Sequence, residues 1–342
     1  EEKGLNGRSL LYPRGKVLGG CSSINGMIYM RGQARDYDGW RQLGNAGWGW
    51  DDVLPYFKRS EDHYKGADDF HGGGGEWRVE EQRLSWEILD AFRKAAAETG
   101  IPPTDDFNRG DNEGCGYFQV NQRRGVRWST AKAFLRPAMN RPNLTVITHA
   151  QAQKLVLDGK RVTGVDFLEG DQPKRIAARG EVILAAGSIG TVQLLELSGI
   201  GNPEVLGEHG IDVAHALPGV GENLQDHLQM RMIFKVEGTV TSDPARATPN
   251  LQFHVQPLSL DKFGDPLHGF PAFTASVCNL RPESRGTVHI RSADFRAAPA
   301  IRPNYLSAPG DRQVAAQAIR LTRRICAAPS LARFKPEEYK PG

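Results

Sequence analysis

The stretch from Pro13 to Trp40, PRGKVLGGCSSINGMIYMRGQARDYDGW, constrains this chain more than any other part of its sequence. It places five glycines within eighteen positions: Gly15, Gly19, Gly20, Gly26 and Gly32. Because glycine has no Cβ, the backbone can approach a flat or charged group closely and bind it through main-chain N–H groups. Apolar residues here follow neither the helical nor the strand period. The stretch predicts a backbone cradle for a large cofactor, and a glycine-rich surface loop is the alternative.

Composition places the chain among ordinary globular proteins. It has 342 residues, which suggests two domains, with 39% hydrophobic and 24% charged residues. The net charge of +3 is too small to indicate a nucleic acid or an anionic membrane as partner. The cluster Arg123, Arg124 and Arg127 is therefore interpreted as a solvated loop and not as a phosphate-binding site.

The cysteines and the apolar runs bear on the compartment and on metal binding. Cys21, Cys115, Cys278 and Cys326 form no C-x-x-C pair, so neither a zinc site nor a disulfide framework is indicated. A reducing cytoplasm is the natural compartment for such cysteines. No run of 18 apolar residues predicts a transmembrane helix, and no signal peptide is visible. We expect a cytoplasmic protein, with peripheral membrane association left open.

The first part of the chain predicts helices separated by turns. Three are expected: Asp52–Arg59 with Asp51 as its cap, Trp86–Thr99 between Ser85 and Gly100, and Thr130–Met139 capped by Ser129. The run from His71 to Gly75 is interpreted as a flexible loop, and His71 is given no role.

From residue 144 the apolar period changes to two. Strands are expected at Leu144–Thr148, at Lys154–Asp158 and Arg161–Leu168 as a hairpin turning at Gly159, and at Glu181–Ser188 before a helix at Gly190–Leu197. A buried strand that runs through a glycine into a helix is half of a nucleotide-binding unit, because it aims free N–H groups at a ligand. Without G-x-G-x-x-G, an ordinary βα unit is the equal alternative.

The last part of the chain predicts a mainly antiparallel second domain. Its expected strands are Met230–Val236, Leu251–Gln256, Phe273–Leu280 and Thr287–Ile290. Asp311 is expected to cap a helix that carries Val314, Ala318, Leu321 and Ile325 on one face. No Walker A, G-x-S-x-G or H-E-x-x-H motif occurs, so the residues alone indicate an α/β cofactor-binding protein and no specific chemistry.

Two long motifs resemble the signatures of the glucose-methanol-choline (GMC) flavin oxidoreductases. Gly15 to Asn25, continuing through Tyr29 and Gly32 to Asp38, resembles the first signature, and Gly187 to Gly201 resembles the second. Further resemblance lies in Arg127 to Leu144, Gly219 to His227 and Leu280 to Thr287. The similarity runs in order along nearly the whole chain, which makes it far more specific than a lone glycine pattern.

The resemblance implies an α/β fold with two functional parts. The first is a doubly wound FAD-binding domain, incomplete here, and the second is an α+β substrate domain with a mainly antiparallel sheet. In this chain the FAD-binding parts would be residues 1–40 and 110–227, the substrate-binding parts mainly 41–109 and 228–310, and the start of the C-terminal region 311–342. The family also implies segments before and after this sequence, and an internal gap near Gly238 to Ser242.

FAD is the cofactor that the resemblance implies. The cofactor-binding residues would be Val17, Gly19, Gly20, Ser22, Asn25, Gly26, Met27, Ile28, Ala152, Ala186 and Gly187. Ile24 occupies the position where some members carry a histidine bonded to the flavin, so FAD is expected to be held non-covalently. No metal is expected.

The implied reaction is the oxidation of a small alcohol, choline or another primary alcohol, by hydride transfer to flavin N5, with an unidentified electron acceptor. Alternatives are a lyase that acts on hydroxynitriles and a non-catalytic remnant. The family's catalytic His and its His or Asn partner are expected beyond the C-terminal end, so no catalytic residue is assigned. His227 is interpreted as structural and Asp226 as a hydrogen-bonding anchor. Four tryptophans could serve a choline site or simply pack in the core: Trp40, Trp48, Trp50 and Trp128.

Overall fold

The computed structural model describes residues 2–237, 251–261 and 265–342, and these fall into two compact units. Unit 1 comprises Glu1–Leu11, Thr145–Asp226 and Pro282–Arg312, and unit 2 comprises Tyr12–Leu144, His227–Arg281 and Gln313–Gly342. The gap expected at residues 238–242 lies outside the described residues. Whether the units correspond to an FAD-binding and a substrate-binding domain stays a prediction. Among the described residues, no helix is both long enough and apolar enough to cross a bilayer.

Unit 1 is built from short sheets, two α-helices and a short 3-10 helix. Its elements are η1 (Lys3–Leu5), β6 (Ala150–Asp158), β7 (Arg161–Glu169), β8 (Gln172–Ala177), α5 (Gly187–Leu197), β9 (Ile200–Gly201), α6 (Pro203–Glu208), β10 (His215–Ala216), β14 (Thr287–His289) and β15 (Ala300–Arg302). Strands β6, β7 and β8 form an antiparallel sheet, β9 pairs in parallel with β10, and β14 pairs with β15. The predicted hairpin is confirmed, and it gains β8 as a third strand. The doubly wound sheet stays a prediction.

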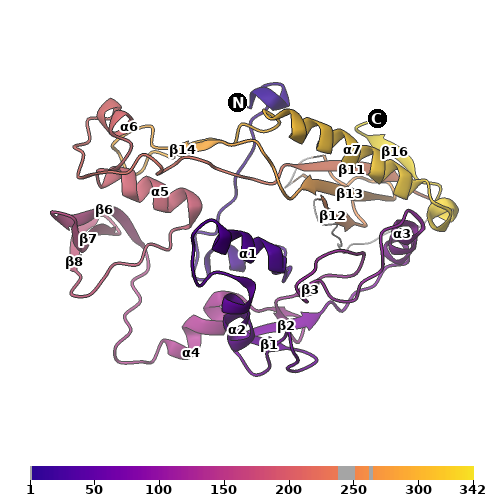
Figure 1. Cartoon of the computed structure of the whole chain (residues 1–342), viewed down its shortest axis with the longest axis horizontal. Helices are drawn as coiled ribbons and strands as arrows, with labels where there is room; N and C mark the ends of the chain where they lie inside the picture. The colour runs from indigo at the N-terminus through magenta and orange to yellow at the C-terminus, as the bar shows by residue number, and fades with distance from the viewer. Residues whose placement is uncertain (1, 238–250, 262–264) are drawn as a thin grey trace. The chain divides into compact units, whose positions relative to one another are not determined.

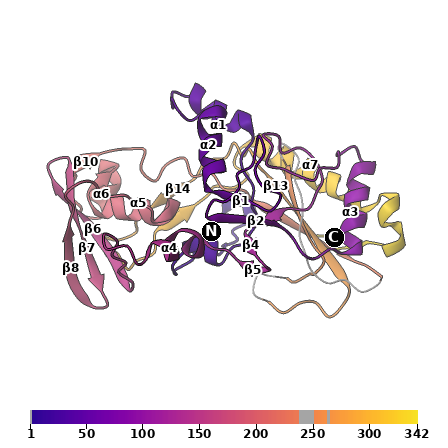
Figure 2. The ribbon, with the colours of Figure 1, turned by 90° about the horizontal axis from the view of Figure 1, so that it is seen from below.

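Helix α5 is held in unit 1 by buried polar contacts and lies beside β6 and β14 (Figure 2). The fully buried Glu196 carboxylate hydrogen-bonds to Nδ1 of His289 at 2.7 Å and accepts the N–H of Ile290 at 2.8 Å. At the end of the helix, the Ser198 hydroxyl accepts the N–H of Leu155 on β6 at 2.9 Å. These bonds fix the axis of the helix whose first residues were predicted to meet a cofactor.

Two strand predictions are wrong. Residues 144–148 form no strand, and residues 181–186 run irregularly into α5, which begins at Gly187 and not at Gly190. One isoleucine in each segment stays exposed, Ile147 at 38% and Ile183 at 80%. Among the described residues no strand pairs with either segment, so their apolar sequences have no ladder hydrogen bonds to join.

Unit 2 holds most of the helices. Its elements in the first part of the chain are η2 (Gly20–Ser23), α1 (Ala34–Gln42), α2 (Trp50–Ser60), β1 (Glu61–His63), β2 (Trp77–Glu81), α3 (Glu87–Glu98), β3 (Gln119–Val120), β4 (Gln122–Arg123), β5 (Val126–Arg127), η3 (Ala131–Leu135) and α4 (Arg136–Ala138). Those in the later part are β11 (Gln229–Lys235), β12 (Leu251–Gln256), β13 (Ala272–Asn279), η4 (Pro329–Phe334), β16 (Glu337–Lys340) and most of α7 (Pro309–Cys326).

The core of unit 2 lies on one face of a four-stranded antiparallel sheet in the order β12-β13-β11-β16. Alternate residues such as Met232, Phe253 and Val277 belong to this core together with residues of α3 and α7. Figure 1 shows the two helices beside the sheet. The predicted stripe of α7 packs into this core. The expectation of a mainly antiparallel sheet is confirmed, although β14, which was grouped with these strands, pairs separately with β15.

Helix ends agree with the predictions at the C-terminus of α3 but not at several N-termini. Gly100 has φ +93°, and its N–H and that of Ile101 bond back to the carbonyls of Ala97 and Ala96, so the predicted glycine end of α3 is confirmed. The caps expected of Ser85 and Asp51 are wrong, because Trp86 and Gly49 hold the N-cap positions.

Asp311 was also predicted as a helix cap, but its carboxylate binds backbone N–H groups of a different segment. It lies in the first turn of α7, where its carboxylate accepts the backbone N–H groups of Glu283 and Ser284 at 2.9 and 2.8 Å. The expected helix after Ser129 is present, with a wider turn over η3 before α4. The positions of these helices were predicted correctly from the sequence. The backbone groups to which their polar residues hydrogen-bond were not.

Candidate functional site

The glycine-rich segment, residues 15–28, folds as a tight loop around η2. A Cβ on Gly15 would come within 2.2 Å of the Gly20 carbonyl oxygen, so this close approach requires glycine. Gly20 itself has φ +53° and Met27 has φ +63°. The left-handed conformation at Met27 is uncommon for a residue with a side chain. The loop is therefore a built backbone shape, and we call residues 15–28 the cradle.

Side chains brace the cradle from behind. The Ser22 hydroxyl donates to the Gly19 carbonyl at 2.5 Å and accepts the Thr130 N–H at 3.0 Å. The Arg127 guanidinium donates to the Ser22 carbonyl at 3.1 Å and to Oδ1 of Asn25 at 2.9 Å. The interpretation of Arg127 as part of a merely solvated loop is therefore wrong, because its guanidinium fixes the cradle.

The cradle leaves an apolar, open surface. Val17 is 56% exposed, Leu18 44% and Ile24 50%. A Cβ built on Gly20 or Gly26 would meet no described atom within 4 Å. Exposed aliphatic side chains beside bare backbone form a surface that a flat aromatic ring could cover. The residues present therefore fit the flavin that the resemblance implies.

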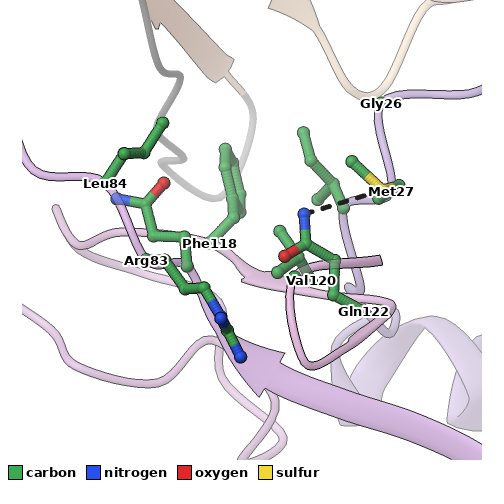
Figure 3. Close-up of a pocket in the computed structure, with 10 residues that line it drawn as sticks. Gly26, Met27, Arg83, Leu84, Phe118, Val120 and Gln122 are labelled. Carbon is green, nitrogen blue, oxygen red and sulfur yellow. Dashed lines mark hydrogen bonds between the residues drawn. The ribbon is translucent and has the colours of Figure 1, made fainter. Parts of the chain in front are cut away.

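A cavity of about 270 Å³ adjoins the end of the cradle (Figure 3). Three predicted residues, Gly26, Met27 and Ile28, line it. The other lining residues are Gln82, Arg83, Leu84, Phe118, Val120, Gln122 and Gly125. Nε2 of Gln122 donates to Sδ of Met27 at 3.7 Å, the dashed contact in Figure 3. Its size suits a small ligand, since ligand pockets begin near roughly 300 Å³.

The remaining predicted residues lie in unit 1. Ala152 is in β6, Ala186 is the N-cap residue of α5, and Gly187 is the first residue of that helix. The first turn of α5 carries no acidic side chain, and residues 186–188 are exposed. A helix end of this kind offers free N–H groups to an anion. The other eight predicted residues lie in unit 2, and each group is described within its own unit.

A buried charge network begins at Arg31, three residues after the cavity residue Ile28. The Arg31 guanidinium donates to the Glu61 carboxylate at 2.9 Å. The ring of His71 bonds to Glu61 through Nδ1 at 3.1 Å and to Asp106 through Nε2 at 2.8 Å. Arg31, Glu61 and His71 are 5% exposed or less. Two cations and two carboxylates thus balance one another in the interior.

The network explains the titration of its members. Burial would lower the pKa of His71, but its hydrogen bonds to Asp106 and Glu61 outweigh burial and raise that pKa to about 9. Burial would raise the pKa of Glu61, but the His71 hydrogen bond and the Arg31 charge hold it below its usual value. His63 stacks on His71 with ring centroids 3.9 Å apart, and burial and the His71 charge lower its pKa. His71 is therefore an imidazolium and His63 a neutral ring at pH 7.

Sequence reasoning missed this network. The run from His71 to Gly75 is not a flexible loop, because a Cβ on Gly72 would lie 1.8 Å from the Lys58 carbonyl oxygen. The denial of any role to His71 is also wrong. The four charged members come from residues 31, 61, 71 and 106, a spacing that matches no motif. Only the unusual density of Asp and His around residues 61–71 hinted at it.

The other candidate histidine, His227, lies at the surface of unit 2. His227 is exposed, and its Nε2 bonds to the Leu280 carbonyl at 3.1 Å, while the Asp226 carboxylate accepts the Tyr305 hydroxyl. The Asp226 contact agrees with its interpretation as a hydrogen-bonding anchor, and the interpretation of His227 as structural stays a prediction. In the described part of the chain, no group of three or more His, Cys, Asp or Glu side chains could hold a metal ion.

The four tryptophans make ring contacts or hydrogen bonds, although Trp40 stays 46% exposed and Trp48 53%. The ring of Trp40 contacts that of Trp48, with centroids 5.9 Å apart, and Tyr37 packs on both Trp40 and Trp50. The indole N–H of Trp128 donates to the Glu76 carbonyl at 2.8 Å. None of these contacts needs a bound quaternary ammonium group to explain it.

Comparison with known proteins gives one consistent family. Two family models described as GMC oxidoreductase match residues 3–229 and 282–342. An alcohol dehydrogenase [acceptor] of Pseudomonas putida is 38% identical over 379 aligned positions, covering 99% of this chain and 69% of that protein. An oxygen-dependent choline dehydrogenase of Photobacterium profundum is also 38% identical, covering 100% of this chain and 67% of that protein. The alignments are longer than the chain, so some residues of the relatives face gaps in it.

Solved structures show the same fold. The crystal structure of pyridoxine 4-oxidase from Mesorbium loti superposes with a TM-score of 0.93 at 29% identity, covering 100% of this chain and 71% of that chain. An FAD-dependent oxidoreductase from Chaetomium thermophilum gives a TM-score of 0.84 at 26% identity, covering 100% of this chain and 74% of that one. The fold is thus a mixed α/β arrangement with antiparallel sheets.

Proposed function

The chain belongs to the GMC oxidoreductase family, whose members are flavin-dependent oxidoreductases of CH–OH donors, and on that premise we propose that it oxidises a small primary alcohol with a dissociable FAD. In unit 2 the cradle would hold the flavin ring, and the contacts expected at Ala152, Ala186 and Gly187 of unit 1 stay a prediction. The adjoining cavity would take the alcohol. The relatives named alcohol and choline dehydrogenases support the substrate class.

One observation carries this proposal. The exposed aliphatic side chains Val17, Leu18 and Ile24 surround bare backbone at Gly20 and Gly26, and the cavity begins at Gly26 itself. A surface loop without a ligand has no reason to be braced by Ser22 and Arg127 from behind while it leaves apolar groups uncovered. A ring lying on this surface would place its edge at the mouth of the cavity.

When bound, FAD would accept the hydride of the alcohol carbon at its N5 atom. The chain's own contribution is to position donors. Oδ1 of Asn25 accepts the N–H of Met27 at 3.1 Å and the Arg127 guanidinium, so this amide presents its NH₂ group to any further acceptor. A donor fixed in this way would stabilise negative charge that develops on the reduced ring. Ile24 has no nucleophilic atom, which supports non-covalent attachment.

Replacing Gly26 with Val tests the placement of the cofactor. The new side chain enters open space at an ordinary backbone conformation, so the protein should fold normally. It would occupy the volume assigned to the ring, and we expect FAD affinity to fall at least about 10-fold, a loss of roughly 1.4 kcal/mol. Flavin fluorescence quenching measures the affinity, and thermal unfolding of the apoprotein checks the fold.

Gly180→Val is the matched control, because Gly180 also faces open space outside the cradle. The control should bind FAD as the wild type does. A Gly26→Val protein that binds FAD with wild-type affinity would show that the cofactor does not cover the cradle.

A further inference from the structure

The sheet of unit 2 has a second face, opposite its apolar core, that carries polar side chains. On β11 the residues that alternate with the core residues are Gln229, Arg231, Ile233 and Lys235. Arg231 pairs across the ladder with Ser276 of β13, and Ser276 pairs with His254 of β12. Because partners in register point to the same side of a sheet, these three side chains form one row.

Arg231 differs from the other residues of this row because its charged group has no protein partner among the described residues. It is half-buried, and within the described ranges its guanidinium has no hydrogen bond, ion pair or ring contact. Burial accordingly lowers its pKa from the usual value. A half-buried guanidinium with no partner in the described part of the protein still has its N–H donors available, so an anionic ligand that reaches it would supply the missing hydrogen-bond partner.

Lys235 shows how the same face satisfies a cation that needs no ligand. Its Nζ lies 4.5 Å from the ring centroid of Tyr339 and 4.8 Å from that of Phe270. Lys235 is four residues from Arg231 on the same strand and face. Lys235 thus has aromatic partners on this face and Arg231 has none among the residues that the structure describes, so the guanidinium of Arg231 is available to bind a ligand.

The polar face adjoins the cavity. The ring of His254 stacks on Phe118, a residue that lines the cavity, with centroids 5.6 Å apart. Beside it, Nε2 of Gln252 contacts Sδ of Met30 at 3.3 Å, two residues beyond the cavity residue Ile28. Strands β11 and β12 are separated by one strand, so the backbones of Arg231 and His254 are about 10 Å apart. A short chain reaching from the cavity could meet the Arg231 side chain.

We propose that Arg231 binds an anionic group, a carboxylate or a phosphate, at the far end of the alcohol substrate. This inference rests on the proposed alcohol oxidation and adds the substrate class to it. The guanidinium fork matches both anions with two parallel hydrogen bonds. The same charge repels a quaternary ammonium, so the chain disfavours choline although some of its relatives are named for it.

The test compares Arg231→Met with the wild type on four substrates. These are ω-hydroxyhexanoate, its neutral amide, ω-hydroxyhexyl phosphate and choline. A charged hydrogen-bonded pair contributes roughly 1.5–3 kcal/mol, so the wild type should favour its anionic substrate over the amide by about 10- to 100-fold in kcat/KM. Arg231→Met should lose this preference through KM and leave the amide unaffected. The two anionic substrates show which anion is bound.

Arg320→Met controls for the loss of one positive charge, since Arg320 is an exposed residue of α7. It should keep the wild-type preference. A binding readout that needs no turnover is the thermal stabilisation by hexanoate or inorganic phosphate. One of these should raise Tm for the wild type and for Arg320→Met but not for Arg231→Met.

The variant's own stability separates binding from structure. Without the unpaired charge, Arg231→Met should unfold at the wild-type temperature or above it. A lower Tm with unchanged substrate preference would make Arg231 structural and overturn the inference. Equal kcat/KM for the hydroxy acid and its amide in the wild type would overturn it too, and would leave the proposed alcohol oxidation standing. Failure to oxidise any alcohol would instead defeat the proposed function.

Discussion

His71, to which the sequence alone assigns no role, lies at the centre of a buried charge network in unit 2. Its ring joins Glu61 to Asp106, and Glu61 joins it to Arg31. The Arg31 N–H in turn bonds to Asn108, whose side-chain NH₂ group bonds to the Tyr29 carbonyl. The network thus holds the segment that leads away from the cavity residue Ile28. We interpret it as the support that keeps the cavity wall rigid.

The His71 network predicts a definite pH dependence of stability. The pKa of His71 is about 9 in the folded chain and about 6.5 when unfolded, so the protonated form stabilises the fold. This contribution, on the order of 3 kcal/mol, is complete below pH about 6.5 and is lost as pH rises through about 9. Its facing groups Glu61 and Asp106 stay ionised across this range, and His63 stays neutral.

Urea denaturation across that pH range measures the effect. The wild type should lose free energy of unfolding as pH rises, and His71→Gln should show a much smaller loss. His227→Gln is the matched control, because His227 is exposed, and it should follow the wild type. If His71→Gln lost as much stability with pH as the wild type, the imidazolium assignment would be refuted.

At the scale of elements, local chemistry was predictable and long-range pairing was not. The turn at Gly159 and the end of α3 at Gly100 depend on one residue each, and both predictions hold. The segments at 144–148 and 181–186 have apolar strand sequences, but among the described residues neither finds a neighbour to complete a ladder. Strand propensity describes how well side chains fit a pleated, half-buried surface. It does not say whether a neighbouring strand is present to form the ladder hydrogen bonds.

The glycine end of α3 gives a prediction at this scale. Gly100→Ala places a Cβ at φ +93° and should destabilise the protein by about 1 kcal/mol. Gly207→Ala is the matched change inside α6, at an ordinary helical position with open space around it, and should stabilise by about 0.5–1 kcal/mol. Chemical denaturation measures both. The same sign for the two changes would contradict the assigned conformations.

The site itself was predictable only in part. The glycine cradle, with Gly26, Met27 and Ile28 at the cavity, follows from local sequence and from the resemblance. The roles of Arg31, Arg127 and Arg231 could not be predicted from the sequence. Arg31 and Arg127 bond to residues far away in the chain, and the lack of a partner at Arg231 within the described ranges is visible only in the fold. A charge in sequence is a solvated charge until tertiary structure buries it. The assignment of individual cofactor contacts stays a prediction.

For the whole molecule, family membership and fold agree with a flavin-dependent oxidoreductase, and the chain has both the glycine-rich cradle and an antiparallel sheet. The family models together match most of the chain, and the superposition on a solved oxidase covers all of it. Each unit carries part of the predicted cofactor contacts. We therefore expect the natural protein to oxidise alcohols only when FAD is bound.

Anaerobic titration of the FAD-loaded natural protein with the substrate series above tests this claim most directly. We expect the absorbance of the bound flavin to bleach on addition of an alcohol, because the alcohol would reduce the flavin and no acceptor would be present to reoxidise it. We also expect the flavin to be released intact when the protein is denatured. A flavin that never bleaches with any alcohol, while mandelonitrile is cleaved, would contradict the account and identify a lyase.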